Sequence, residues 1–570
     1  MRRLQPGEVL KVRAIAGLHV VALAWDFVNT LSVTGDTLPA ELQGLLGFAI
    51  EREELDAGGV VAERYMLRGI KRFRDKDQGL PPGTPVPLDE HPVQSFLWAD
   101  YTPKPGTTYT YRVVPLHGKP KNLQPNDAAS VKVTVTTEPE VAPAAGAVAR
   151  HDVYFNRGVI GSQAYARKFP DIEPNPAEPT SAPMKWLSRG LYEALLGFIA
   201  RARNEHFTLR AAFYEFRYLP VAIALRKAID GGADVKIVYD AESSYKMDNE
   251  ATLHDAMLLE SEICIPRTVT EGIRHNKFMV LLEDGHPVAV WTGSTNISAG
   301  GIFGHSNVGH VVWDATVAAA YLAYWERLAK NLTPTKLRAP NRTATPTPNG
   351  KTPPNSVVPL FSPRDEKESV ATLQWYADRM AEAGRLVCLT LAFNFDEVFQ
   401  KVIVPETDVL RYIVKDDDLG DGETIGVDRD VLFAGGGRFD EGALKNFLAE
   451  PGNPLNSNDY IHTKYMLVDP LGEDPLVVSG SANFSRPSQR INDENMLVIR
   501  GDRRVADIYF GEFMRIFDHH YARYIVRKLQ GEGKGDPEAG YLKDKAEDWV
   551  RPHFDSRSYK SKRRRYFVEG

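Results

Sequence analysis

The sequence predicts a multidomain protein, in which an N-terminal all-β sandwich is followed by two α/β halves. Three observations carry this prediction. Apolar and polar residues alternate along short segments up to about residue 137, as they do in half-buried strands. From about residue 150, helical and strand patterns alternate, and after about residue 365 the same order returns. A chain of 570 residues has room for three such units, since an average domain has about 150.

The composition is that of a folded protein without a strong charge bias. With 43% hydrophobic and 25% charged residues the chain can bury a core, and its net charge of −6 excludes a globally basic nucleic-acid coat protein. Two cysteines, Cys264 and Cys388, are too few for a disulfide framework or a thiolate metal site. Polar residues interrupt the basic start before any signal-peptide core, and no apolar run is long enough for a membrane span. We therefore expect a cytoplasmic protein without a transmembrane segment.

Residues 1–137 contain the alternating segments LKVRAIAG, VQSFLWADY, TYTYRVVPL and ASVKVTVTT, separated by Pro and Gly. This region resembles a fibronectin type III domain, with Tyr109 at the place of the tyrosine corner and Trp25 at that of the early core tryptophan. Residues 51–92 exceed the family pattern and are interpreted as an insertion. Because such modules usually bind other proteins or separate neighbouring domains, this region could bind a protein partner, and we expect no catalytic residue in it.

The two α/β halves are predicted over residues 150–332 and 360–530. In the first, the helical pattern MKWLSRGLYEALLGFIARAR precedes the strand pattern FTLRAAFYEF, and a second helix ends at two glycines before the strand pattern DVKIVYD. In the second, ESVATLQWYADRMAEAG precedes LVCLTLAF and VLRYIVKD. Residues 333–359 hold seven prolines and are expected to be an extended surface linker. Residues 531–570 form a basic extension, whose KSKRRR run is more often a solvated tail than a contact for nucleic acid or anionic lipid.

An internal repeat carries the chemistry. The segment RHNKFMV at residues 274–280 returns as IHTKYML at 461–467, and each runs into a GSxN segment, at 293–296 and 480–483. The interval from histidine to glycine is the same in both copies, and every motif position of the second copy is displaced from the first by the same offset. A single HxK is common, but two copies in the same register are not, which argues against ordinary histidines near strand ends.

The residue types of the repeat suit a phosphate group. On a strand, residues i and i+2 point to the same face, so each HxK presents an imidazole and an ammonium together. Lysine supplies a positive charge, the GSxN side chains supply further donors, and histidine can act as nucleophile or proton carrier. Two half-sites that face each other would surround one phosphorus with His275, Lys277, His462 and Lys464.

These motifs resemble the phospholipase D superfamily, whose signature is HxKxxxxD followed by GSxN, over roughly residues 150–530. The second copy matches it fully, with Asp469 at the aspartate position, which is mainly structural in the family. In the first copy Leu282 occupies that place. The resemblance implies two α/β/α phospholipase D-like halves related by pseudo-twofold symmetry. It also implies one site between them, a phosphohistidine intermediate, and no metal or other cofactor.

An acidic residue shortly after GSxN supports a histidine in this family. Glu494 follows Asn483 at the same interval at which Asn307 follows Asn296. Because a carboxylate favours the charged imidazole, we expect Glu494 to support His462 as general acid and later base. On the same argument Asn307 orients His275, the nucleophile. The predicted catalytic residues are His275, Lys277, Asn296, His462, Lys464, Asn483 and Glu494, the predicted substrate-binding residues are Ser294, Ser481 and Asn307, and Asp469 is predicted to be structural.

The motif predicts cleavage of a phosphodiester and leaves the substrate open. A nuclease is favoured, with nucleic acid as substrate, because neither a secretion signal nor a membrane anchor is found. A phospholipase D acting on phospholipids is the alternative, and residues 416–430, with seven acids and one arginine, speak against a nucleic-acid groove. A third possibility is a non-catalytic phosphate-binding protein. The serines and asparagines of GSxN could also be turn formers, and Glu494 a surface acid.

Overall fold

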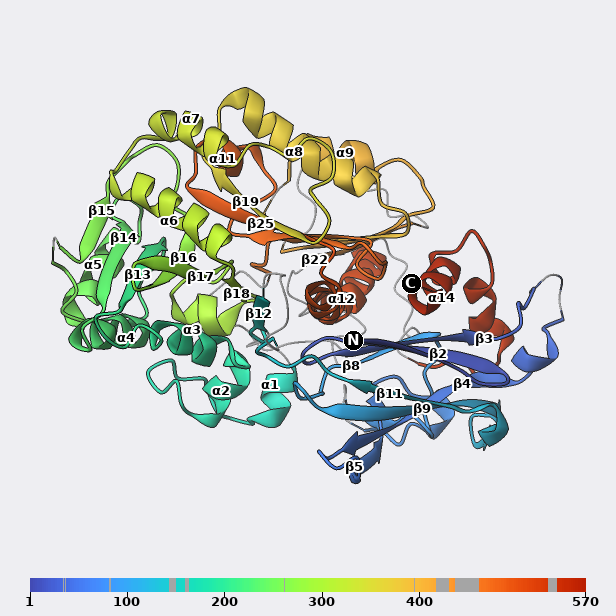
Figure 1. Cartoon of the computed structure of the whole chain (residues 1–570). Coiled ribbons are helices and arrows are strands. Elements are labelled where there is room, and N and C mark those ends of the chain that lie inside the picture. Colours follow the sequence, from blue (N-terminus) through green and yellow to red (C-terminus); the bar gives the residue numbers. More distant parts are fainter. Residues whose placement is uncertain are drawn as a thin grey trace.

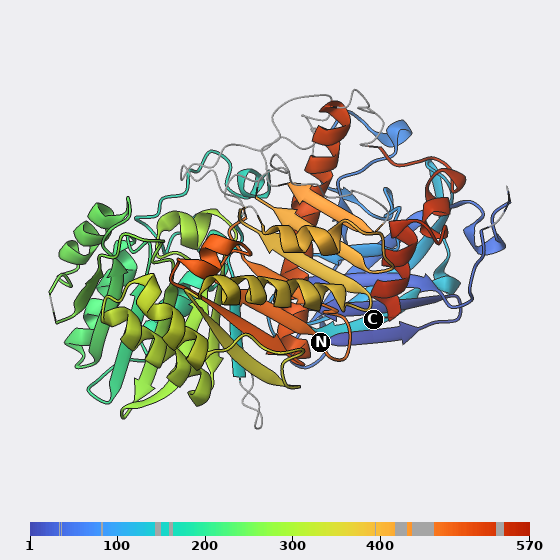
Figure 2. The ribbon, with the colours of Figure 1, turned by 90° about the horizontal axis from the view of Figure 1, so that it is seen from above.

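The computed structural model describes residues 1–570 except 34, 36, 81–83, 143–149, 159–162, 261, 394, 417–429, 436–460, 532–540 and 570. Three β-rich bodies succeed one another along the chain. In Figure 1 the N-terminal sandwich (blue) lies below the second half (yellow to red), and the first half (green) lies beside both. The view from above shows the same side-by-side arrangement of the halves (Figure 2).

The N-terminal region is a sandwich of two antiparallel sheets. One sheet has the order β1-β2-β3-β8 and the other β10-β9-β4-β5, with β11 pairing with β9. Their bounds are β1 Arg2–Pro6, β2 Leu10–Ala16, β3 Val21–Phe27, β4 Leu45–Leu55, β5 Val61–Met66, β8 Leu97–Asp100, β9 Thr108–Lys119, β10 Asn122–Pro125 and β11 Val131–Thr136. Trp25 and Tyr109 are fully buried in the core, and the Tyr109 hydroxyl accepts a hydrogen bond from the backbone N–H of Lys104 at 2.9 Å. This contact is typical of a tyrosine corner, while membership of the fibronectin type III family stays a prediction.

The first α/β half contains a seven-stranded mixed sheet with the order β12-β18-β17-β16-β13-β14-β15. Its strands are β12 Arg150–Phe155, β13 Phe207–Phe213, β14 Asp234–Asp240, β15 Cys264–Arg267, β16 Lys277–Glu283, β17 His286–Gly293 and β18 Val308–Trp313. Its helices are α1 Gln163–Lys168, α2 Ala182–Ser188, α3 Leu191–Ile199, α4 Leu219–Asp230, α5 Lys246–Asp255 and α6 Ala315–Ala329. The carboxylate of Asp314 accepts a hydrogen bond from the backbone N–H of Val317 and so fixes the start of α6.

The second half repeats this sheet, with the order β19-β25-β24-β23-β20-β21-β22. Its strands are β19 Ser356–Ser362, β20 Leu386–Leu391, β21 Leu410–Lys415, β22 Val431–Gly435, β23 Tyr465–Val468, β24 Leu476–Gly480 and β25 Glu494–Arg500. Its helices are α8 Glu366–Ala381, α9 Glu397–Ile403, α11 Arg486–Arg490 and α12 Arg503–Gly531. In both sheets three strands run parallel, and the strand that follows HxK is antiparallel to the first of them. The sequence repeat is therefore a repeat of topology.

The prediction of an extended linker over 333–359 is wrong. Residues Pro334–Ala344 form helix α7, and the segment ends inside β19. Proline at the first helical position is compatible with a helix because its missing N–H has no intrahelical partner there. Leu337 and Asn341 are fully buried, and the Asn341 side chain hydrogen-bonds to Arg327 and to the carbonyl of Pro363. The segment is thus part of the packed structure.

The C-terminal extension is packed rather than solvated, which corrects the sequence interpretation. It contains α13 Glu547–Val550 and α14 Tyr559–Glu569, and α14 packs on strand β3 of the sandwich. Within the basic run, the Lys562 ammonium donates to the carbonyl of Thr407 at 2.9 Å and Arg564 forms an ion pair with Asp26. The extension therefore connects the sandwich to the second half.

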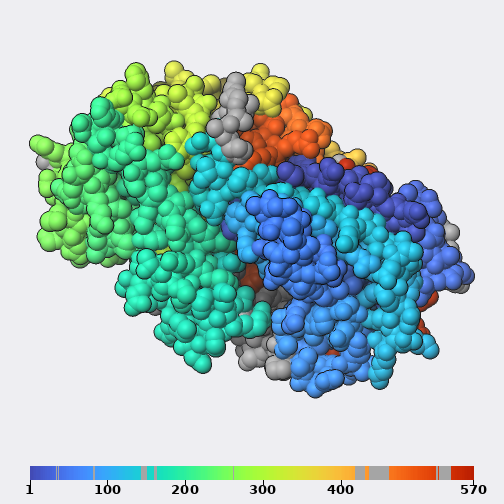
Figure 3. All heavy atoms as spheres, turned by 60° about the horizontal axis from the view of Figure 1, so that its bottom comes forward, coloured from blue at the N-terminus to red at the C-terminus, as the bar shows by residue number. Residues whose placement is uncertain are grey.

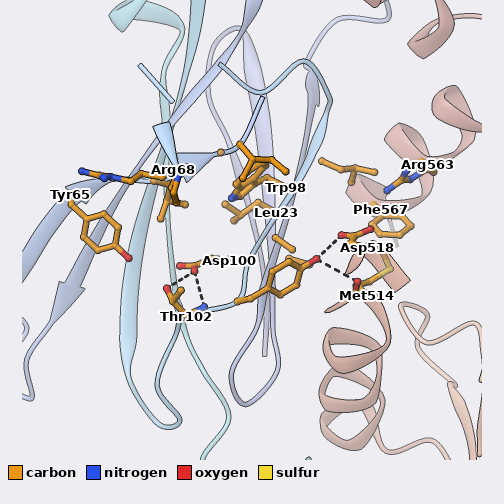
Figure 4. A pocket seen from close by; sticks show the side chains of 18 residues that line it. Leu23, Tyr65, Arg68, Trp98, Asp100, Thr102, Met514, Asp518, Arg563 and Phe567 are labelled. Atoms are coloured by element: carbon orange, nitrogen blue, oxygen red, sulfur yellow. Dashed lines mark hydrogen bonds between the residues drawn. The ribbon is translucent and has the colours of Figure 1, made fainter. Parts of the chain in front are cut away.

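The sandwich shares a hydrophobic core with the halves. Ile15, Leu18 and Ala24 belong to the same buried cluster as Phe510 of α12 and Phe278 of β16. Figure 3 shows the sandwich (blue to cyan) lying against both the green and the orange parts of the chain. A cavity of about 610 Å³ remains between the sandwich and helices α12 and α14 (Figure 4). At its edge the Tyr101 hydroxyl donates a hydrogen bond to the carboxylate of Asp518 at 2.5 Å.

Candidate active site

The fold brings the two HxK motifs together. His275 lies just before β16 and His462 just before β23, so both stand at the ends of equivalent strands. The centroids of their imidazole rings are 6.4 Å apart and the rings are roughly perpendicular. Both histidines are buried. One phosphorus atom can therefore lie between two imidazoles, as the sequence predicts.

Each lysine has the same contact with its own motif. The Lys277 ammonium donates to the backbone carbonyl of His275 at 2.5 Å, and the Lys464 ammonium to that of His462 at 2.6 Å. An ammonium has three protons, so the contact of Lys277 leaves it further protons for a bound anion. Burial lowers the pKa of Lys277 to about 7, although Glu494 and Glu215 act in the opposite direction. A bound phosphate would favour the charged ammonium.

Three consecutive residues of the second half hold His275. The Asn492 side-chain oxygen accepts a hydrogen bond from the backbone N–H of Ile273 at 3.1 Å, and the backbone N–H of Asp493 donates to the carbonyl of Ile273 at 2.9 Å. The Glu494 carboxylate then lies 2.8 Å from Nδ1 of His275. We call residues 492–494 the acidic clamp.

Three consecutive residues of the first half hold His462 in the same way. The backbone N–H of His462 donates to the carbonyl of Ser306 at 3.2 Å, and Nδ1 of His462 lies 3.0 Å from the side-chain oxygen of Asn307. The ring of His305 lies 4.8 Å from that of His462, centroid to centroid. We call residues 305–307 the neutral clamp.

The predicted pairing of Glu494 with His462, and of Asn307 with His275, is therefore wrong. Each clamp leads into a strand of its own sheet, β25 or β18, but faces the histidine of the other half. Counting residues within one half cannot reveal a contact that crosses between halves. The sequence identifies both partners but pairs each with the wrong imidazole.

The crossed pairing fixes the protonation of both rings. Since a carboxylate and an amide oxygen both accept, each imidazole in its neutral form carries its proton on Nδ1 and directs the lone pair of Nε2 elsewhere. Burial lowers the pKa of His275 to about 4, with Glu494 opposing the shift. Burial also lowers the pKa of His462 well below its ordinary value, and Lys464 and His305 add to this effect. Both rings are therefore neutral near pH 7 before an anion binds.

The GSxN segments support this arrangement. A Cβ at Gly293 would collide with the carbonyl of Val308, and one at Gly480 with the carbonyl of Asn495, so only glycine permits these close strand contacts. The Ser294 hydroxyl donates to the Asn307 side-chain oxygen at 2.7 Å. The Ser481 hydroxyl accepts from the backbone N–H of Asn495 at 3.0 Å.

These contacts give both serines and Asn307 a positioning role within the protein, and direct contact with substrate stays a prediction for all three. The Asn296 amide nitrogen donates to Glu215 at 2.6 Å. The side-chain oxygens of Asn296 and Asn483 are buried without a hydrogen-bond partner among the described residues.

Asp469 lies away from the imidazoles. Its carboxylate accepts hydrogen bonds from the backbone N–H groups of Gly384, Arg385 and Leu386, at 2.7, 2.8 and 3.0 Å. These bonds hold the chain where it enters β20. Asp469 thus has the structural contacts that the resemblance implies, while Leu282 at the equivalent place of the first half packs into the core.

Several side chains of the site were not singled out from the sequence. Tyr214 lies edge-on to His275, with ring centroids 5.1 Å apart, and its ring is 5.2 Å from the Lys277 ammonium. Phe393, half exposed, lies 6.0 Å from the Lys464 ammonium. Both follow the first parallel strand of their sheets, which is the one signal that could have found them. His305 and Asn492 occupy equivalent positions of the two copies, so the repeat register could have identified His305.

Among the described residues, no group of three or more His, Cys, Asp or Glu side chains is arranged to hold a metal ion. No helix in the described part of the chain is long and apolar enough to cross a membrane. Most of the acidic stretch 416–430 lies outside the described residues, but its first member, Asp416, accepts a hydrogen bond from the backbone N–H of Ile461 at 2.6 Å. That acid therefore belongs to the support of the second HxK.

Residues 436–519 match a family model described as cardiolipin synthase, PLD-like domain. No curated protein matches the sequence. Among solved structures, the chain is similar to phosphatidylserine synthase from Haemophilus influenzae (13% identity, TM-score 0.41, covering 61% of this chain and 92% of the other). It is also similar to polyphosphate kinase from Porphyromonas gingivalis (10% identity, TM-score 0.36, covering 54% of this chain and 46% of the other). A third similar structure is Nuc, a phospholipase D family member from Salmonella typhimurium (19% identity, TM-score 0.22, covering 32% of this chain and 95% of the other).

The chain thus spans about half the length of the polyphosphate kinase. At these TM-scores none of the three structures assigns a substrate to the chain.

Proposed function

We propose that the chain is a phosphodiesterase of the phospholipase D superfamily, and that it cleaves its substrate without a metal, through a phosphohistidine on His275. The observation that carries the proposal is the pair of imidazoles with ring centroids 6.4 Å apart, each beside a buried lysine. The two lysines bind the non-bridging oxygens of the phosphodiester. Their charge stabilises the pentacoordinate transition state, in which the negative charge on these oxygens increases.

In the first step Nε2 of His275 forms a bond to phosphorus while the bond to the leaving oxygen breaks. His462, which the bound anion has helped to protonate, donates its Nε2 proton to that oxygen. In the second step neutral His462 takes a proton from water, whose oxygen attacks phosphorus, and the bond to His275 breaks. The histidines then return to their starting states.

The acidic clamp supports His275 as the nucleophile. An imidazole that bears phosphorus on Nε2 and hydrogen on Nδ1 is a cation, and the Glu494 carboxylate lies 2.8 Å from that Nδ1. The neutral clamp cannot stabilise such an adduct on His462, but it leaves His462 a weakly basic proton carrier. The role assignment thus remains that expected from the sequence, for a different reason. A phosphorylated peptide that contains His462 would reverse it.

We also propose that the two halves are related by pseudo-twofold symmetry around this site. The identical strand orders of the two sheets, the constant offset between the two copies of the motif and the reciprocal clamps support this relation. One chain then forms one complete site. Mixing a His275→Ala protein with a His462→Ala protein should restore no activity, and substantial recovery would mean that the site is shared between chains.

For the substrate we propose a phospholipid, in preference to the nucleic acid that the sequence favours. Phe393 and Ile273, 50% and 39% exposed, lie beside Lys464 and the acidic clamp, and so give the site an apolar edge. An apolar edge suits the acyl chains of a phospholipid better than a strand of phosphates.

Nucleic acid is the second candidate. Exposed Arg217 lies 4.7 Å from the ring of Tyr245 and offers a cationic, aromatic platform. However, Arg217 also pairs with Glu215 at 3.0 Å, which weakens its attraction for a polyanion.

A substrate panel in EDTA tests the function. Phosphatidylcholine vesicles, phosphatidylglycerol vesicles, single- and double-stranded DNA, RNA and a soluble aryl phosphodiester are incubated with the wild type and with His275→Ala. Cleavage of a vesicle lipid by the wild type alone supports the proposal, and cleavage of DNA or RNA alone selects the nuclease. Activity that is lost in EDTA and restored by a divalent ion would exclude the metal-free mechanism. Cleavage of none, with retained binding of inorganic phosphate, would favour the phosphate-binding protein.

A further inference from the structure

His305 departs from the internal repeat at a position that contacts His462, the proposed proton carrier. In the register of the repeat it corresponds to Asn492, just as Asn307 corresponds to Glu494. Asn492 binds the backbone of Ile273 and donates to Glu494 at 3.3 Å. His305 instead places a ring against the ring of His462, at 4.8 Å between centroids and 44° between planes. The two clamps therefore differ at all three positions, since Ser306 corresponds to Asp493.

The surroundings of His305 keep it uncharged. It is buried, and the cations Lys464 and Arg217 both act on it. Burial and these two cations lower the pKa of His305 to about 3. Its neighbour His462 faces the cations Lys464 and Lys277 as well as His275. Lys464 and Arg217 both oppose a second imidazolium here, so His305 presents a neutral ring to His462 near pH 7.

We propose that His305 is the positioning residue of the proton carrier. Its ring packs on His462 and limits rotation of that imidazole, while Asn307 fixes Nδ1. Nε2 of His462 then stays directed at the leaving oxygen through both steps. The inference rests on the proposed function of His462 and adds a residue to it. It also explains why the first half carries a histidine where the second carries an asparagine.

The contact can be removed and restored in the full-length protein. His305→Ala removes the ring, His305→Phe keeps a flat ring without nitrogen, and His305→Asn copies the second half. His286→Ala is the control, since His286 is exposed at the start of β17. Turnover is measured with methyl aryl phosphates whose leaving groups range from p-nitrophenol to phenol, because only a poor leaving group needs its proton.

We expect His305→Ala to lower kcat for the phenol ester by about 10- to 100-fold and for the p-nitrophenol ester by less than about 3-fold, the pattern of a weakened general acid. His305→Phe should restore most of this loss and His305→Asn should not. Equal losses for both esters, no loss, or a His305→Phe protein as impaired as His305→Ala would each overturn the proposal.

A measurement without turnover separates this inference from the proposed function. Selective ¹⁵N-histidine labelling reports the imidazole nitrogens, and the His462 signals are assigned by their absence from His462→Asn. We expect one sharp Nδ1–H tautomer in the wild type and in His305→Phe, and a shifted or broadened signal in His305→Ala. An unchanged His462 signal in His305→Ala would refute positioning even if no phosphodiester substrate were found. A wild type that cleaves nothing would refute the proposed function alone.

Discussion

The two half-sites share their motifs, strand order and lysine contacts, yet their histidines face different partners. His275 faces the carboxylate of Glu494, whereas His462 faces the amide of Asn307 and the neutral ring of His305. The difference comes from three consecutive residues that each half contributes to the other. A duplicated fold can thus give its two histidines different tasks without changing either HxK motif. In the proposed mechanism, the role of each histidine depends on the opposite clamp.

The largest expected effect is the loss of the nucleophile. His275→Ala should lower turnover by at least about 10⁴-fold with any leaving group, since no bond to phosphorus can form. His462→Asn should lower turnover of a poor leaving group by about 10²- to 10⁴-fold, but still release p-nitrophenolate in a first burst. Acid-quenched His462→Asn should then carry phosphate on His275, as read by mass spectrometry. If both variants lost the burst equally, the two histidines would not be distinct.

Changing the charge of each clamp tests whether the clamps give the two histidines their different roles, and its expected effect is the second largest. Glu494→Gln removes the anion beside His275, and we expect its adduct to form about 10- to 100-fold more slowly, the effect of a shift of about 1–2 pKa units. Asn307→Asp places an anion beside His462 and should raise the pKa of that imidazole, so that the high-pH limit set by the general acid moves upward. Rates of adduct formation and pH profiles of kcat with a poor leaving group measure both effects. Unchanged profiles would show that the clamps do not set the charges.

The pH dependence of phosphate binding offers a smaller effect. Since the pKa of Lys277 is lowered to about 7, this ammonium is charged below that pH and loses its proton above it. With a p-nitrophenyl ester, which needs little help from His462, kcat/KM should fall as pH rises through about 7. Lys277→Arg keeps its charge. The kcat/KM of Lys277→Arg should therefore not fall as pH rises through about 7, even if its maximum value is lower than that of the wild type. A decline that persists in Lys277→Arg would assign it to another group.

Much of this arrangement could be predicted from the sequence, because it depends on local pattern. Period-2 alternation predicts the sandwich, and the register of HxK and GSxN predicts two equivalent strand ends. These features involve residues near one another in the chain. The match to residues 436–519 lies in the same half as the complete second motif.

The predictions that the structure contradicts concern contacts between segments that are distant in the sequence. The sequence pairs Glu494 with His462, although the hydrogen bond joins it to His275 in the other half. The seven prolines of residues 333–359 predict an extended linker, although Leu337 and Asn341 are buried. The composition of the KSKRRR run predicts a solvated tail, although Arg564 pairs with Asp26 of the sandwich. In each case burial against a remote element outweighs the local composition.

The smallest expected effect concerns the sandwich, which touches neither clamp through any contact described above. Tyr101→Phe removes the hydroxyl that donates to Asp518 at 2.5 Å beside the cavity in Figure 4. A hydrogen bond to a partly buried carboxylate contributes about 1–3 kcal/mol, so the midpoint of urea unfolding should fall while the rates of both catalytic steps stay unchanged. Tyr566→Phe is the matched control, because its exposed hydroxyl donates to the carbonyl of Asp408 at 2.9 Å and its loss should cost less than about 0.5 kcal/mol. A changed burst or leaving-group dependence in folded Tyr101→Phe would show that the sandwich does act on the two histidines.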